Sequence, residues 1–132
     1  MKTHEKLLNL LENGGDDAEF NARFWCWLNG YHPDCDIVDD GGYFISKLWE
    51  DELNRYSNII PKYLTSLDAC KAVMDEYLEG WCLEKLTENK KGWLCAFRKT
   101  DGLLVNNLWL PTEQRARLHA MIQAIAHERG EA

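Results

Sequence analysis

The sequence predicts an α+β fold in which a three-stranded antiparallel β-meander is flanked by helices, giving helix–sheet–helix layers. Three observations carry this prediction. Residues 67–78 place apolar side chains at helical spacing, three strand-like runs follow within residues 81–110, and a second amphipathic segment follows Pro111. The last two strands are separated by an Asp-Gly pair, which is typical of hairpins. With 132 residues, 45% of them hydrophobic, the chain can bury a core without disulfides.

The N-terminal part, residues 1–59, is predicted to form a helical and partly irregular subdomain. Its clearest element is a helix that begins at the aspartate pair 16–17, where aspartate is a good N-cap, and ends at an Asn-Gly pair. A shorter helix over residues 4–11 precedes it, and residues 43–45 are a candidate strand. The longer helix carries one apolar stripe, which consists of Phe20, Phe24, Trp27 and Leu28.

The C-terminal part, residues 60–132, is predicted to hold the core of the fold in the order helix, three strands, helix. Thr65 or Ser66 caps the first helix, Thr112 caps the last one, and the strands are expected at residues 81–87, 93–99 and 103–110. If both turns are tight, the core face of the sheet carries Cys82, Leu86, Trp93, Cys95, Phe97, Leu104, Leu108 and Leu110. The opposite face then carries Leu83, Leu94, Ala96, Val105 and Trp109 beside Lys85 and Arg98.

The formal net charge of −7 lies entirely in the N-terminal half. Residues 1–60 hold five Lys or Arg against twelve Asp or Glu, whereas residues 61–132 hold ten of each kind. A protein that binds phosphate backbones normally presents a basic surface, so we expect no direct binding of nucleic acid. An acidic surface suits a basic protein partner, or serves solubility alone.

The apolar segments and the cysteines indicate the cellular compartment in which the protein is expected. No apolar run approaches the roughly 18 residues that span a bilayer, and polar residues interrupt the N-terminal leucines, unlike in a secretory signal. The five cysteines form no CxxC pair, and a cytosolic chain keeps such cysteines reduced. We therefore expect a cytoplasmic protein with no membrane segment and no cofactor.

The nearest approach to a metal site is the group of Cys26, His32 and Cys35. Cysteine and histidine are good zinc ligands, but a structural site usually takes four ligands from two close pairs, and no second pair follows. We interpret the three residues as ordinary helix and loop positions, and we expect no metal. Because no recognised motif frames a nucleophile either, we expect no enzymatic activity.

Aromatic side chains are concentrated in the acidic stretch between residues 20 and 56. Those of the helix stripe are expected in a core. The others allow two interpretations, a second small core or a binding surface, since Trp and Tyr dominate interface hot spots. The candidate binding residues are Trp25, Tyr31, Tyr43 and Trp49.

The sequence IPKYLTSLDA at residues 60–69, followed by an apolar helix and Glu79-Gly80-Trp81, resembles the start of the phage ABA-sandwich domain family. Two strand tryptophans, Trp93 and Trp109, and an alanine-rich last helix fit the rest of that pattern. The resemblance covers about residues 60–129. It implies a phage or prophage origin, helix–sheet–helix layering and an accessory role, and it brings no catalytic residues.

The sequence thus predicts a non-enzymatic phage or prophage accessory protein that acts by binding in the cytoplasm of a host bacterium. An acidic, aromatic-containing surface suits inhibition of a host or defence protein. One alternative is a small-molecule-sequestering oligomer, and another is a metal-dependent enzyme built on the Cys26 group. A homodimer is also expected, because it would relieve an unpaired sheet edge. The anion contacts of the oligomer would be Arg98, Lys99, Arg115 and Arg117.

Overall fold

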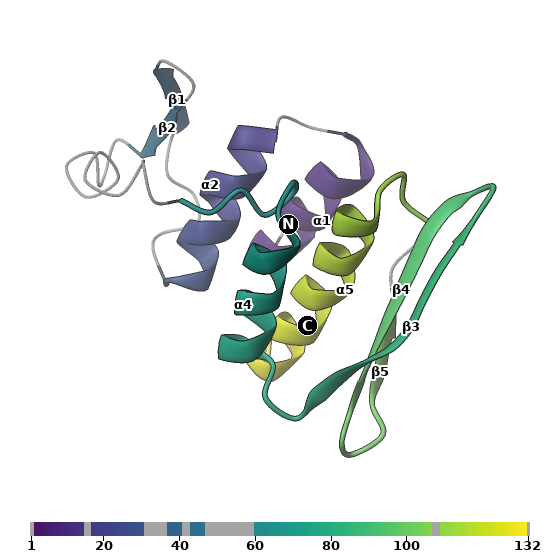
Figure 1. Cartoon of the computed structure of the whole chain (residues 1–132). Coiled ribbons are helices and arrows are strands. Elements are labelled where there is room, and N and C mark those ends of the chain that lie inside the picture. Colours follow the sequence, from purple (N-terminus) through teal and green to yellow (C-terminus); the bar gives the residue numbers. More distant parts are fainter. Residues whose placement is uncertain are drawn as a thin grey trace. The chain divides into compact units, whose positions relative to one another are not determined.

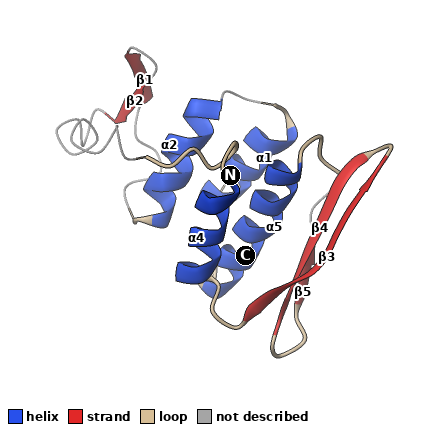
Figure 2. Cartoon of the chain, in the orientation of Figure 1, coloured by secondary structure: helices blue, strands red, loops and turns tan. Residues whose placement is uncertain are grey.

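The computed structural model describes residues 2–14, 17–30, 37–40, 43–46, 60–106 and 109–131. Within these ranges it confirms the α+β class, with four helices, a two-stranded hairpin and a three-stranded antiparallel sheet (Figures 1 and 2). The chain divides into two compact units, an N-terminal unit over Thr3–Lys62 and a C-terminal unit over Tyr63–Ala132.

The N-terminal unit contains two helices and a β-hairpin. Helix α1 spans Thr3–Glu12 and contacts helix α2, which spans Asp17–Leu28. Strands β1 (Ile37–Asp40) and β2 (Tyr43–Ser46) pair antiparallel, and β2 contacts α2. The predicted helices and the strand at residues 43–45 are confirmed, whereas β1 was not predicted because its sequence, IVDD, ends in two aspartates, which are rare in strands.

The aromatic stripe of α2 accounts for the burial of this helix. Phe20, Phe24 and Trp27 are at most 5% exposed. Their rings form a stack along one face, with centroids 5.4 Å apart for the first pair and 6.1 Å for the second. Acidic residues in the first turn favour the start of the helix, because they oppose the positive end of the helix dipole.

The C-terminal unit begins and ends with capped helices. Helix α4 spans Leu67–Tyr77, and the Ser66 side chain accepts a hydrogen bond from the amide of Ala69 at 3.1 Å. Helix α5 spans Glu113–Glu128, and the Thr112 side chain accepts from the third amide of that helix at 3.1 Å. Such caps satisfy backbone donors that have no partner within the helix, so both helix starts are set by local sequence.

The chain between these helices forms the sheet, in the strand order β3-β4-β5. Strand β3 spans Trp81–Asn89, β4 spans Gly92–Lys99 and β5 spans Leu104–Asn106. The first two are joined by a two-residue turn, and the last two by the three-residue loop 100–102, closed by Lys99 N donating to Leu103 O at 2.8 Å. The predicted strand over residues 103–110 is shorter than expected, although Leu110 forms an isolated bridge with Trp93.

The prediction of which side chains share a face of the sheet was partly wrong. A bulge between Leu83 and Lys85 adds one residue to β3, and the loop after β4 has three residues, an odd number. Each feature shifts the pairing by one residue, and such a shift moves a side chain to the other face. The first list is therefore right for Leu86, Trp93, Cys95, Phe97 and Leu110 but wrong for Cys82 and Leu104, which share a row with Arg98. Leu83 and Val105, from the second list, share the row of Phe97, and Leu108 lies outside the described residues.

The core of the C-terminal unit lies between the face of Phe97 and helix α5, which contacts both β4 and β5. The predicted alanines of α5 are fully buried, together with Leu118, Met121 and Ile122. Burial raises the pKa of the Cys70 thiol on α4 to about 11 and that of Cys95 on β4 to about 12. Leu67, which was expected on the apolar stripe of α4, is instead 48% exposed, because it occupies the first position of the helix.

Candidate functional site

The predicted aromatic surface belongs to the N-terminal unit. Trp25 lies on α2, outside the buried stripe, and is partly exposed, while Phe24 and Trp27 on either side of it are buried. Tyr43 is the first residue of β2. Tyr31 and Trp49 lie outside the described residues. Of the four candidates, the structure thus gives the exposure of Trp25 and the backbone position of Tyr43.

Of the three residues considered as a metal group, only Cys26 lies within the described part of the chain. Cys26 is 3% exposed and lies in the interior of α2. His32 and Cys35 fall outside the described residues. Among residues that the structure does describe, no group of three or more His, Cys, Asp or Glu side chains could hold a metal ion.

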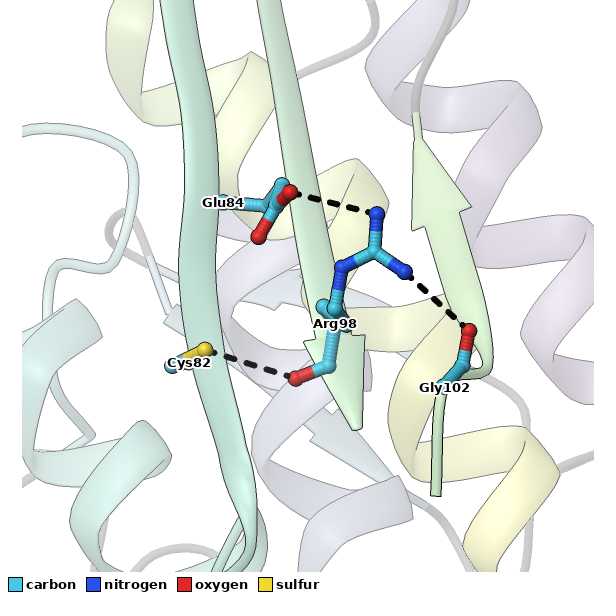
Figure 3. A network of polar contacts seen from close by, with 4 residues as sticks. All are labelled: Cys82, Glu84, Arg98 and Gly102. Carbon is cyan, nitrogen blue, oxygen red and sulfur yellow. Dashed lines mark hydrogen bonds and ion pairs between the residues drawn. The ribbon is translucent and has the colours of Figure 1, made fainter. Parts of the chain in front are cut away.

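A second candidate surface, which the sequence analysis did not propose for binding, is the face of the sheet opposite Phe97. We call it the outer face, and it carries Cys82, Lys85, Thr87, Leu94, Ala96, Arg98 and Leu104. Leu104 is 44% exposed, and Cys82 is also exposed. Figure 3 shows Cys82 and Arg98 on adjacent strands, with helix α5 behind the sheet.

Arg98 is the centre of a small polar network on the outer face (Figure 3). Its Nη2 lies 3.1 Å from Oε1 of Glu84, and its Nη1 donates to the carbonyl of Gly102 at 3.3 Å. Glu84 is the extra residue of the bulge, which explains how its side chain reaches Arg98 on this face. The hydrogen bond from Arg98 to Glu84 raises the pKa of the guanidinium above its ordinary value.

A shallow depression of about 310 Å³ adjoins this network, and Arg98, Lys99 and Trp81 are among its lining residues. Lys99 Nζ lies 2.8 Å from Oε1 of Glu128 at the end of α5, and the Trp81 indole N–H donates to the same oxygen at 2.8 Å. The hydrogen bond from Lys99, followed by that from Trp81, lowers the pKa of Glu128 below its ordinary value. This cluster joins β3 and β4 to α5.

The ion pairs of the C-terminal unit limit what the depression can bind. Two of the four predicted anion contacts, Arg98 and Lys99, already lie against carboxylates, and Arg117 lies 3.3 Å from Glu113. A bound anion would have to compete with those carboxylates.

Comparison of the sequence and the structure with protein-family models, curated proteins and solved structures gave no significant match. The resemblance to the phage ABA-sandwich family therefore stays a prediction. None of the described helices is long and apolar enough to cross a membrane.

Proposed function

We propose that this protein is a non-enzymatic phage or prophage accessory protein that binds and inhibits a host or defence protein in the bacterial cytoplasm. The observation that carries the proposal is the exposure of Trp25. Helix α2 buries Phe20, Phe24 and Trp27, yet leaves this fourth large aromatic ring partly accessible. Tryptophan is among the residues most enriched in binding hot spots, and here it belongs to a half of the chain that carries the whole charge of −7.

The charge distribution indicates the chemistry of the partner. An acidic surface attracts a basic one over a distance of about one Debye length, roughly 8–10 Å at physiological salt. The partner is therefore a protein with a basic surface and a recess for an indole ring. Association with such a partner should weaken as ionic strength rises.

Affinity purification from the bacterial host tests this function. The tagged protein and its Trp25→Ala variant would be compared by quantitative mass spectrometry of the retained proteins at increasing NaCl. Leu67→Ala is the matched control, because Leu67 is also an exposed apolar residue on a helix but belongs to the C-terminal unit. We expect one basic protein to be retained by the wild type and by Leu67→Ala, and to be lost at least about tenfold with Trp25→Ala. Equal retention by all three proteins would refute the proposal.

We also propose that the protein forms a homodimer through its C-terminal unit. Strand β3 is the outer strand of the described sheet on one side and is nine residues long, and the outer face carries the exposed Leu104. A second copy that pairs with β3 would satisfy the backbone groups of that edge, and one that covers the outer face would remove Leu104 from water. Sedimentation velocity over a range of protein concentrations tests this, and a monomer at every concentration would rule the homodimer out.

A further inference from the structure

The described charges of the outer face include one close pair, Glu84 with Arg98, and the cation Lys85. Glu84 and Arg98 lie 3.1 Å apart, and their side chains remain 42% and 41% exposed. Lys85 follows on the edge strand β3, where a long side chain can extend past the edge into solvent. The end of the face near the last residues of β4 therefore carries an exposed dipole with a negative and a positive end.

Two copies of such a pair, related by a two-fold rotation, can face each other so that each negative group meets a positive one. An axis parallel to the sheet, lying above the outer face and at right angles to the line from Glu84 to Arg98, exchanges the negative and positive positions and turns a second copy so that its outer face meets that of the first. A second copy placed on that axis brings its carboxylate over the guanidinium of the first copy and its guanidinium over the carboxylate. Closed homodimers use interfaces of this isologous kind.

We propose that two copies of this chain pack outer face to outer face about this axis, so that Arg98 pairs with Glu84 of the partner subunit and the reverse. This inference rests on the proposed homodimer and specifies its interface. Leu104 and Cys82 lie beside Arg98 in the same cross-strand row and supply the apolar part of the contact. Sheets that pack face to face lie about 10 Å apart, a distance that an arginine and a glutamate extending toward each other can bridge.

The area of the outer face limits the affinity of the two copies for each other. A standard stable interface buries roughly 800 Å² on each partner. Because β5 is only three residues long, the outer face is a small patch by that measure. The dimer is therefore weak and reversible, and both its charge pairs and its concentration dependence are measurable in solution.

Charge reversal at the two residues, followed by sedimentation equilibrium, tests the interface. In Arg98→Glu, and separately in Glu84→Arg, the facing groups have like charges, so each variant should associate at least about tenfold more weakly than the wild type. An equimolar mixture of the two variants should form a heterodimer, because each glutamate then faces an arginine. The doubly exchanged chain, Glu84→Arg with Arg98→Glu, should dimerise like the wild type. Lys90→Glu at the tip of the β3–β4 turn is the matched control and should leave association unchanged.

Recovery in the mixture separates an interface role from a loss of folding, since a variant that fails to fold cannot be rescued by mixing. If the wild type dimerises but the single variants dimerise equally well, or if the mixture stays monomeric, this interface is wrong while the homodimer stands. If the wild type is monomeric at all concentrations, the homodimer and this interface both fail.

Discussion

Replacing Gly92 with alanine should destabilise the C-terminal unit more than the same change at any glycine in an open turn. Gly92 has φ +117°, a conformation that side chains with a Cβ rarely adopt, and a Cβ built there would collide with the carbonyl group of Leu110. The backbone strain alone costs about 1–3 kcal/mol. To relieve the collision, Leu110 must also move away from Trp93, with which it exchanges hydrogen bonds of 2.7 and 3.0 Å. Two weakened bonds add about 1–3 kcal/mol.

Gly102→Ala provides the control for this experiment. Gly102 has φ +101°, but a Cβ at that position meets nothing within 4 Å. It therefore carries the strain cost without the collision. Urea unfolding followed by circular dichroism would give the two free energies of unfolding, and Gly92→Ala should lose about 1–3 kcal/mol more than Gly102→Ala. Equal losses would show that Leu110 does not approach the β3–β4 turn as closely as described.

Three other changes have defined outcomes. Thr112→Ala removes the N-cap of α5 and should lower the free energy of unfolding by about 1 kcal/mol, whereas Thr112→Ser should retain most of it; equal losses would exclude the cap. The pKa of Glu128 is lowered in the folded state, so its ionised form stabilises the fold above the ordinary Glu value of 4.5, and this contribution is lost as the pH falls through the lowered pKa. Glu128→Gln should therefore reduce stability at pH 7 and flatten its decline in acid, and a parallel acid profile would contradict the cluster with Lys99 and Trp81. Iodoacetamide at pH 8 should alkylate the exposed Cys82 well before the buried thiols of α4 and β4, as peptide mass mapping would report, and equal labelling would contradict their burial.

Helix boundaries and caps were predictable because their determinants lie within a few residues of each other. Ser66 and Thr112 bond to amides three residues ahead, and the stripe of α2 repeats within its own length. The position of Trp25 outside the apolar stripe of α2 was visible in the sequence, although a second core and a binding surface both stayed possible for it. These features depend on local spacing, which a single sequence displays directly.

The composition of the outer face was predictable only in part, because it depends on the register of the strands. One extra residue in a strand or loop moves the following side chains to the other face. The bulge before Lys85 and the odd loop after Lys99 each add one residue. The predicted strand ends leave the same three loop residues, but no local pattern in the sequence marks the bulge. Together the bulge and the loop bring Cys82 and Leu104 into the row of Arg98. The contact of Glu128 with Trp81 also joins residues 47 positions apart, which no spacing rule connects.

The sequence by itself therefore determined the class of the fold, the order of its elements in the C-terminal unit, and the concentration of negative charge in the N-terminal half. Hydrophobic periodicity, capping residues and charge are all properties of neighbouring residues. Only the tertiary structure placed Cys82 and Leu104 on the outer face and paired Glu84 with Arg98 there. The physical reason is that strand register is fixed by turns, bulges and packing acting together, and a shift of one residue exchanges the two faces of a strand.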